Sequence, residues 1–367
     1  MGAAEQTRGR FVIDGGRALR GTIAPGGNKN EALPVLAASL LVEGEVTIDG
    51  LPDIGDVATL LDGLQGIGAR VSRRGPGRVA LDTSSRLGGD PDPALASRIR
   101  GSVLLAPGLL ARTGRAVLLA PGGDRIGRRR LDTHLAALHA LGVQVEDEHL
   151  VRLTLHGRFR GADVFLDEAS VTATENAVMA AVLADGRTCI ANAACEPHVQ
   201  GLCRFLNAMG ARIEGIGTNV LRIEGVQELH PAAHRIAPDH IEVGSFIALA
   251  AMTRGEIRIA PVVHDDLRMI RLIYERLGVV TEFDGNALLV PAAQELQIAA
   301  DRGGAVPKVD DAPWPGFPAD LTSLALVVAT QCRGTVLIHE NERPESDRDR
   351  MQQAVTQCPA AALRLVD

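Results

Sequence analysis

A glycine-rich loop that runs into consecutive arginines carries the residue types best suited to chemistry. Residues 121–134 read PGGDRIGRRRLDTH, between an apolar segment and a helix expected to begin near Leu131. Glycines let the backbone approach a bound anion, and the free N–H groups of a helix start favour negative charge. Guanidinium groups form paired hydrogen bonds with phosphate or carboxylate. The loop therefore predicts a site for a small anion, with a solvated surface loop as the alternative.

A second loop has a similar pattern. IAPGGNKNEALPVLAAS places Lys29 and Asn30 at the start of an apolar helix, again after two glycines. This resembles a phosphate-binding loop, although the GxxxxGK[ST] pattern of nucleotide-binding P-loops is absent. The alternative is that Asn28 only caps the helix, since asparagine is a preferred N-cap residue.

Two more segments offer charged groups where helices are expected to begin. Arg98 and Arg100 in SRIRGSVLLA are either ligands of an anion or solvated side chains at an exposed helix start. Asp320 in DDAPWPGFPADLTSLAL directly precedes an apolar helix, so its local pattern favours a capping role. The proline-rich approach makes this loop rigid, and a rigid loop can also hold a catalytic carboxylate.

The composition argues against several classes of partner. A net charge of −7 over 367 residues does not suit binding to a nucleic-acid backbone. The five cysteines show no CxxC pair and no zinc-ligand spacing, so we expect neither disulfides nor a metal site, and a reducing cytoplasm fits best. The first residues contain no apolar signal region, and no apolar run reaches the roughly 18 residues of a membrane-spanning helix. We expect a soluble protein with small anionic partners.

An internal repeat predicts the fold. A glycine followed by a strand-like segment recurs at intervals of roughly 70 to 80 residues, each time after an Ala- and Leu-rich helical stretch. The first four strands are each followed by an amphipathic helix that ends on a glycine suited to a C-cap. The repeating glycines before the strands are Gly44, Gly114, Gly186, Gly255 and Gly334, and the expected C-cap glycines are Gly68, Gly142, Gly210 and Gly278. The pattern predicts repeated helix, strand, helix, strand units.

The repeat breaks in its fifth copy. After about Glu340 the expected second helix is replaced by NERPESDRDRMQQAVTQCPAAALRLVD, and no sixth copy follows. Residues 341–351 are polar without a sustained apolar stripe, so we expect either a solvated tail or a locally disordered end there. A sequence that lacks the sixth unit would also leave a sheet edge and apolar helix faces uncovered.

Six motifs in order give the chain a family resemblance. They are GGNKNEALP, PGGDRIGRRRLDTH, SVTATEN, ANAACEPHV, APDHIEVGSF and WPGFPADLTS, and the resemblance covers about residues 10 to 340. Together they resemble the enolpyruvyl transferase family, in particular its sugar-nucleotide branch. The GGNKN and GRRRLDTH loops set the chain apart from the branch that acts on shikimate 3-phosphate.

The resemblance implies a fold and a division into domains. We expect an α/β protein, a two-domain inside-out α/β barrel of repeated βαβαββ units with the last unit missing. The first domain would span residues 29–237. The second would combine residues 1–28 with 238–367 and be incomplete at its C-terminus. The active site would lie in the cleft between the two domains.

The resemblance also implies a reaction. The family moves the enolpyruvyl group of phosphoenolpyruvate to a hydroxyl and releases phosphate, which requires a cationic clamp, an acid and a base. The acceptor implied here is the 3-hydroxyl of UDP-N-acetylglucosamine, in the synthesis of peptidoglycan precursors. No cofactor or metal is expected, because phosphoenolpyruvate is a co-substrate. The alternatives are another uridine nucleotide as acceptor, or a non-catalytic protein that binds a UDP-sugar.

Each motif carries expected roles from the family onto residues of this chain. Lys29 and Arg129 match the cations for phosphoenolpyruvate, and Arg129 also reaches the sugar nucleotide. Asp124 stands where most members carry a reactive cysteine and would act as an acid, while Asp320 would be the base for the attacking hydroxyl. The other expected sugar-nucleotide contacts are Asn30, Arg100 and Asp320, with Leu131 and Asp132 at the uracil pocket and Ser170, Val171 and Thr172 at the diphosphate. The family's further Asp and Arg residues of the sixth unit have no counterpart here.

Overall fold

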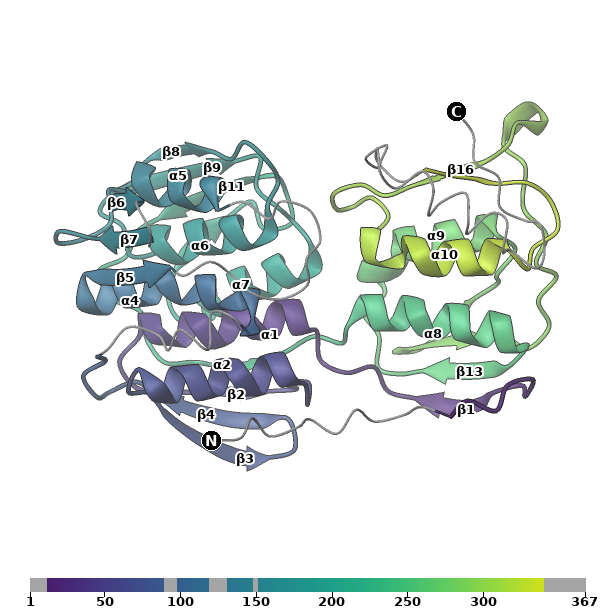
Figure 1. The fold of residues 1–367 in the computed structure, drawn as a ribbon, viewed down its shortest axis with the longest axis horizontal. Helices are drawn as coiled ribbons and strands as arrows, with labels where there is room; N and C mark the ends of the chain where they lie inside the picture. The colour runs from purple at the N-terminus through teal and green to yellow at the C-terminus, as the bar shows by residue number, and fades with distance from the viewer. Residues whose placement is uncertain (1–11, 89–97, 119–130, 148–150, 340–367) are drawn as a thin grey trace, which may run out of the picture.

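Two hydrophobic cores organise the chain into two lobes. The computed structural model describes residues 12–88, 98–118, 131–147 and 151–339 (Figure 1). One core gathers buried residues between positions 32 and 236, and the other gathers buried residues between 243 and 328. The predicted domain boundaries, after residues 28 and 237, stay a prediction.

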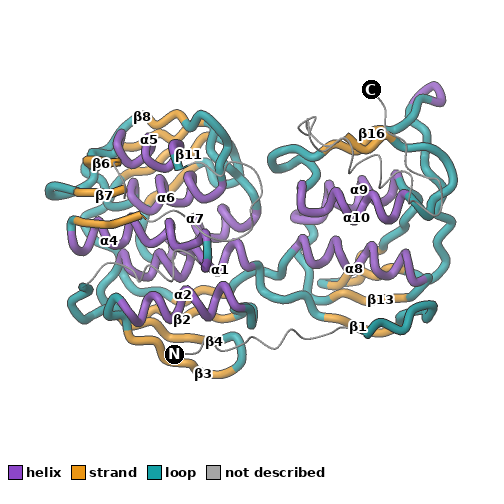
Figure 2. Tube along the Cα trace, viewed as in Figure 1, coloured by secondary structure: helices purple, strands orange, loops and turns teal. Residues whose placement is uncertain are grey.

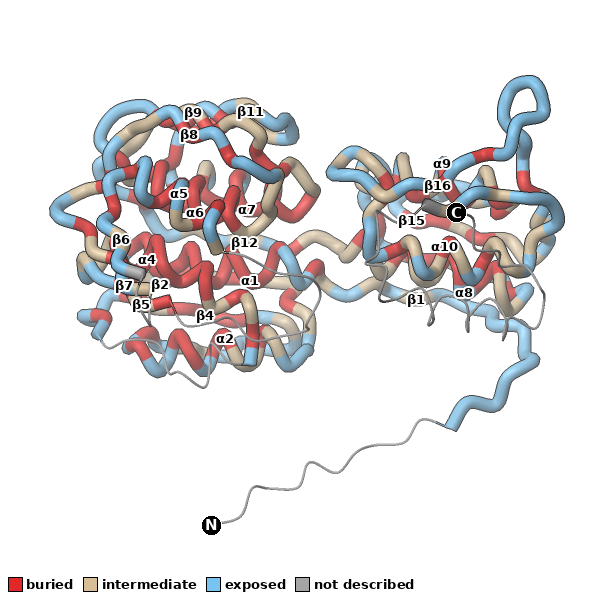
Figure 3. The backbone as a smooth tube through the Cα atoms, turned by 45° about the horizontal axis from the view of Figure 1, so that its top comes forward, coloured by how far each residue is buried: buried red, intermediate tan, exposed pale blue. Residues whose placement is uncertain are grey.

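Helices lie inside each lobe and sheets lie on its outside (Figure 2). The reason is visible in α1 (Lys29–Ala38) and α6 (Val171–Ala181), in which every residue from Glu31 to Ala38 and from Ala173 to Ala181 is buried (Figure 3). A helix that is buried on all sides must be surrounded by other elements. Their many alanines allow close approach of neighbouring helices. This arrangement agrees with the predicted inside-out α/β architecture.

The described residues of the first lobe form three sheets. The first has the strand order β12 (Ala233–Arg235), β2 (Glu45–Asp49), β4 (Arg78–Asp82), β3 (Arg70–Gly75). The second has the order β5 (Arg115–Leu118), β7 (Val151–Thr154), β6 (Gln144–Asp147). The third has the order β10 (Arg212–Glu214), β11 (Val220–Glu224), β9 (Arg187–Ala191), β8 (Asp163–Phe165). The accompanying helices are α1, α2 (Gly55–Gly66), α4 (Ala106–Thr113), α5 (Asp132–Ala140), α6 and α7 (Pro197–Ala208), with the 3-10 turns η1 (Ser39–Leu41) and η2 (Arg100–Leu105).

The second lobe repeats the pattern. Its larger sheet has the order β1 (Arg20–Ile23), β13 (Glu256–Ile259), β15 (Ala287–Val290), β14 (Glu282–Asp284), and its smaller one pairs β16 (Lys308–Asp310) with β17 (Leu337–His339). Its helices are α8 (His240–Thr253), α9 (Arg268–Arg276) and α10 (Thr322–Ala329), with the 3-10 turns η3 (Asp265–Leu267), η4 (Arg302–Gly304) and η5 (Ala319–Leu321).

The predicted repeat is confirmed by these elements. Each four-stranded sheet has one parallel pair and then an antiparallel hairpin, and β16 and β17 form a parallel pair. The four glycines that end the second helices all have left-handed φ values, between 83° and 105°. That conformation returns the chain to a strand at little cost only for glycine. One detail of the prediction was wrong: the segment after Arg98 begins as the 3-10 turn η2, and the α-helix α4 starts only at Ala106.

Two segments of the chain cross between the lobes. The first strand, β1, pairs in parallel with β13 of the second lobe, while β12 pairs in parallel with β2 of the first lobe. Between them, Gly27 and Pro238 form an antiparallel bridge. Asn28 donates its N–H to the Ala237 carbonyl at 2.8 Å, and Asp239 donates to the Gly26 carbonyl at 2.9 Å. The two crossing segments therefore hold each other (Figure 1).

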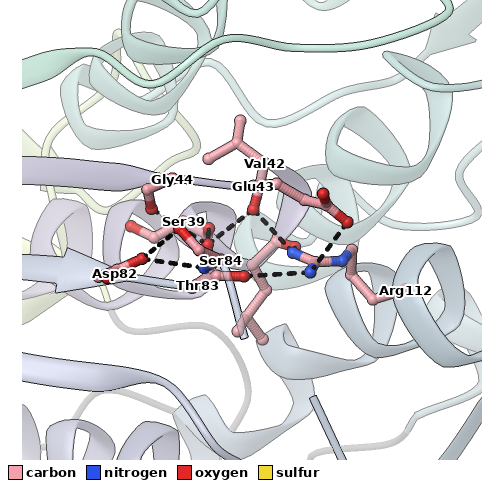
Figure 4. A network of polar contacts seen from close by, with 9 residues as sticks. Ser39, Val42, Glu43, Gly44, Asp82, Thr83, Ser84 and Arg112 are labelled. Carbon is pink, nitrogen blue, oxygen red and sulfur yellow. Dashed lines mark hydrogen bonds and ion pairs between the residues drawn. The ribbon is translucent and has the colours of Figure 1, made fainter. Parts of the chain in front are cut away.

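Arg112 secures the first lobe at the far end of α1 (Figure 4). Its guanidinium donates to the Val42 carbonyl at 2.7 Å and to the Thr83 carbonyl at 3.1 Å, and it pairs with Glu43 at 3.3 Å. The Thr83 hydroxyl donates to the same Val42 carbonyl at 2.7 Å. A cation at the C-terminal end of a helix donates to carbonyls that have no partner within the helix, and it interacts favourably with the negative end of the helix dipole.

Replacing this arginine should destabilise the first lobe. We predict that Arg112→Met lowers the free energy of unfolding by about 2 to 3 kcal/mol, because the Arg112 side chain is only 13% exposed and its carbonyl partners lose a charged donor. Urea unfolding would measure the change. Arg268→Met is the matched control: its side chain is 80% exposed, so the change should stay within about 0.5 kcal/mol. Equal effects of the two substitutions would contradict this role of Arg112.

Candidate active site

A cavity of about 640 Å³ lies where the two lobes face each other. Its wall includes six of the residues that the sequence predicted for the site: Lys29, Asn30, Arg100, Val171, Thr172 and Asp320. The first five come from three separate elements of the first lobe, and Asp320 comes from the second lobe. A cavity of this size is typical of small-molecule sites.

Helix starts surround this cavity. The first residues of α1, η2 and α6 line it from one lobe, and those of α8 and η5 line it from the other. The first N–H groups of a helix have no partner within the helix, and the helix dipole adds positive potential there. Several helix starts that meet at one cavity make it a favourable place for an anion.

Asn28 fixes the start of α1 and links it to the second lobe. Its side-chain oxygen accepts the Glu31 N–H at 3.1 Å, so the predicted capping role is confirmed. Its side-chain amide lies 3.3 Å from Nδ1 of the buried His240. A Cβ atom at Gly27 would lie 1.8 Å from the Gly50 carbonyl oxygen, so this glycine permits close packing of the crossing segment. Gly27 thus has a structural role that the sequence did not indicate.

Lys29 is an exposed cation of this wall. Its ammonium lies 3.4 Å from the Asp56 carboxylate in the first turn of α2, and both side chains are nearly half exposed. An exposed pair of this kind contributes little stability. The ammonium therefore remains available to an anionic ligand, and Asp56 is a site neighbour that the sequence reasoning missed.

Thr172 is held by a buried histidine. Its hydroxyl lies 3.1 Å from His134 Nε2, and His134 Nδ1 lies 3.0 Å from the side-chain amide of Asn176. The amide can only donate, so Nδ1 accepts and the proton resides on Nε2, which donates to Thr172. Burial, with the Arg100 charge nearby, lowers the pKa of His134 to about 4 and keeps the ring neutral. The Thr172 hydroxyl is left with its own proton to donate to a ligand.

Asp239 belongs to the cavity wall, although the sequence analysis did not select it. Its carboxylate caps α8 by accepting the Ile241 N–H at 2.9 Å. Burial raises its pKa, while backbone N–H groups that include that of Lys29 oppose the shift. Asp239 therefore connects the start of α8 with the start of α1. The proline–aspartate sequence at the beginning of an apolar helix is a capping signal that could have identified it.

Asp320 does not cap a helix, so the local interpretation of this residue was wrong. It is the middle residue of η5, whose cap residue is Pro318, and neither η5 nor α10 has a side-chain cap bond. Asp320 is exposed and lines the cavity. The rigid proline-rich loop thus presents the Asp320 carboxylate to the cleft. The catalytic role of Asp320 stays a prediction.

The remaining predicted residues lie in three places. Ser170 caps α6 by accepting the Ala173 N–H at 3.4 Å, directly before the two cavity residues of that helix. Leu131 is the cap residue of α5 and packs on the first core, and Asp132 begins that helix; neither is part of the described cavity wall. Asp124 and Arg129 lie outside the described residues. Their roles stay predictions.

The comparisons with known proteins agree with this arrangement. A family model described as EPSP synthase (3-phosphoshikimate 1-carboxyvinyltransferase) matches residues 13–356, nearly the whole chain. The chain belongs to the EPSP synthase family. Among curated members, the UDP-N-acetylglucosamine 1-carboxyvinyltransferases of Treponema denticola and Bradyrhizobium diazoefficiens are 50% and 51% identical to it. Each alignment covers 90% of this chain and 77% of the relative.

Solved structures support the enolpyruvyl transferase fold. The enolpyruvyl transferase NikO from Streptomyces tendae superposes with a TM-score of 0.77 at 22% identity, covering 93% of this chain and 80% of NikO. EPSP synthase from Acinetobacter baumannii gives a TM-score of 0.69 at 18% identity, with 93% and 79% covered. The predicted fold class is therefore confirmed, and within the family the high identities lie with the sugar-nucleotide enzymes.

Neither a membrane-spanning helix nor a metal-binding cluster is found among the described residues. Among the described residues, no helix is both long and apolar enough to cross a membrane. The same residues contain no group of three or more His, Cys, Asp or Glu side chains placed to hold a metal ion.

Buried histidines at the junction of the lobes give the protein a pH-dependent stability. His198 and His240 stack with ring centroids 6.3 Å apart, and burial lowers the pKa of His198 to about 3 and of His240 to about 4. The folded protein keeps both rings neutral, whereas the unfolded chain protonates them near the usual pKa of about 6.5. This contribution is fully present above pH 6.5 and is lost progressively as the pH falls toward the folded-state values.

His198 provides the test, since neither ring nitrogen has a hydrogen-bond partner among the described residues. We predict that His198→Phe makes the loss of unfolding free energy on acidification shallower by about 1 kcal/mol per pH unit between pH 6 and 5. Urea unfolding at a series of pH values would measure both slopes. The exposed His156, changed to Phe, should leave the slope unaltered. An unchanged slope for His198→Phe would show that this ring is not kept neutral by folding.

Proposed function

We propose that the protein transfers the enolpyruvyl group of phosphoenolpyruvate to the 3-hydroxyl of UDP-N-acetylglucosamine and releases phosphate, a step in peptidoglycan precursor synthesis. The observation that carries the proposal is the interlobe cavity, which is lined by six residues expected from the sugar-nucleotide enzymes, five from the first lobe and Asp320 from the second. About 50% identity to curated enzymes named for this reaction, over 77% of their length, supports the same substrates.

The reaction proceeds by addition and elimination. The acceptor oxygen forms a bond to C2 of phosphoenolpyruvate, its proton passes to a base, and the C2–C3 electron pair takes up a proton at C3. In the second step C3 loses a proton, the double bond re-forms, and the C2–O bond to phosphate breaks. The products are the enolpyruvyl ether and inorganic phosphate, and no external oxidant or reductant is needed.

The cavity offers a group for each need of this reaction. Asp320, on its rigid loop, is the proposed base for the acceptor hydroxyl. Lys29 and the adjacent helix starts stabilise the negative charge on phosphate as it departs. Thr172, oriented by His134, donates to the diphosphate of the sugar nucleotide. Asp124 and Arg129 are proposed to supply the acid and a further cation.

The proposal extends to cofactors and location. No cofactor is required, since phosphoenolpyruvate provides the transferred group. A cytoplasmic location is proposed because the four cysteines in the described part of the chain are free thiols, which suits a reducing compartment. The partners are then two small anionic substrates.

Phosphate release tests this function. With phosphoenolpyruvate and UDP-N-acetylglucosamine, the purified protein should release inorganic phosphate, and Asp320→Asn should lower kcat by about 100-fold or more because the base is lost. Asp301→Asn, an exposed carboxylate of the same lobe, is the matched control and should retain full activity. Phosphate release with UMP in place of the UDP-sugar would indicate another uridine nucleotide as acceptor. A folded protein that binds the UDP-sugar without turnover would contradict the proposed transfer.

A further inference from the structure

Glu175 faces the cavity from the second turn of α6. It follows Val171 by four residues, a spacing that places two side chains on the same face of a helix. Val171, Thr172 and Glu175 all line the cavity. None of the roles expected from the sequence involves Glu175, which lies one turn deeper than the residues proposed for the diphosphate.

The carboxyl group of Glu175 is buried without a full set of partners. Glu175 is 1% exposed, and its Oε1 has no hydrogen-bond partner among the described residues. A buried polar atom without a partner is costly, so it usually meets one in another state of the protein. Because Glu175 lines the cavity, a ligand atom can reach its carboxyl group from there.

The charges around Glu175 determine its protonation. Burial raises its pKa well above the ordinary value, and the carboxyl of Glu196 raises it further. Glu196 is itself largely buried with a raised pKa, and the thiol of the nearby Cys203 stays protonated because burial raises its pKa to about 12. The other ionisable groups on the cavity wall are Lys29, Arg98, Arg100, Asp56, Asp239 and Asp320. Burial and the neighbouring Glu196 carboxyl therefore favour the protonated form of Glu175, in which the carboxyl can donate a hydrogen bond.

We propose that Glu175 is a further substrate-binding residue, whose carboxyl donates a hydrogen bond to a phosphoryl oxygen held against the start of α6. The inference rests on the proposed function, because the two candidate sources of that oxygen are its two substrates. One is the diphosphate of UDP-N-acetylglucosamine and the other is the phosphate of phosphoenolpyruvate. Ionised Glu175 would repel either group, so binding should weaken as the pH rises and the carboxyl loses its proton.

Calorimetric titration of the full-length protein with each substrate separately tests this assignment. Glu175→Leu removes the donor and should weaken binding of one substrate about ten-fold or more. Glu175→Gln keeps an N–H donor but cannot ionise, so its affinity at neutral pH should stay within about three-fold of the wild type. Glu168→Leu and Glu168→Gln are matched controls, since Glu168 is exposed and lies outside the cavity wall. Urea unfolding of each variant shows which are folded.

The pH dependence gives a second readout that a purely structural role would not produce. The diphosphate diester of UDP-N-acetylglucosamine carries no group that titrates between about pH 6.5 and 8.5, unlike a phosphate monoester. For a diphosphate contact, the Kd of the wild type for UDP-N-acetylglucosamine should rise as the pH is raised and Glu175 loses its proton, and the Kd of Glu175→Gln should stay level. If phosphoenolpyruvate makes the contact, the difference between wild type and Glu175→Gln should appear in its titration instead.

The outcomes separate this inference from the proposed function. Unchanged binding of both substrates by folded Glu175→Leu, or the same pH dependence in wild type and Glu175→Gln for both substrates, would overturn the role of Glu175 even where the wild type releases phosphate. A wild type without turnover, whose affinity still depends on Glu175 as described, would overturn the transferase reaction and leave the Glu175 contact in place.

Discussion

The backbone pairing of the two crossing segments is the constraint on which the candidate site depends. Hydrogen bonds from Asn28 to Ala237 and from Asp239 to Gly26 hold the segments side by side. Each segment leads directly into a helix, α1 on one side and α8 on the other, so the same pairing positions the first residues of both helices. The packing of Gly27 against the Gly50 carbonyl and the contact between Asn28 and His240 reinforce it. The cavity wall is thereby assembled from both lobes.

Electrostatics then support the proposed binding of anions in this cleft. Helix starts supply N–H groups from several directions, and Lys29, Arg98 and Arg100 add full charges. The carboxylates of Asp56, Asp239 and Asp320 limit the positive potential, while burial and the Glu196 carboxyl raise the pKa of Glu175 and favour its neutral form. At the other end of the first lobe, Arg112 donates to the backbone carbonyls of Val42 and Thr83, beyond the C-terminal end of α1. Positive charge is thus proposed to serve ligand binding at one end of the lobe and stability at the other.

The repeat and the motifs predicted much of this protein. Strand-forming segments after Gly44, Gly186 and Gly255, and the helices that end on positive-φ glycines, could be located from periodicity because they depend on local sequence. Lys29 and Arg100 were predicted from charge at helix starts. Asp239 and Glu175 were not predicted. In the sequence, Asp239 resembles an ordinary helix cap and Glu175 resembles a residue inside an apolar helix. Only the packing of the two lobes shows that both line the cavity. The capping prediction for Asp320 was wrong because local sequence cannot show that the rigid loop places η5 before α10.

In the proposed complex, one ligand is held by both lobes at the helix starts. Hydrogen-exchange mass spectrometry of the full-length protein, with and without UDP-N-acetylglucosamine, tests it directly. We predict slower exchange in the first turns of α1 and α6 together with the segment 318–322 of the second lobe, because the ligand's oxygens bind N–H groups there and the cleft excludes water. Slower exchange confined to one lobe, or located away from these helix starts, would contradict the account.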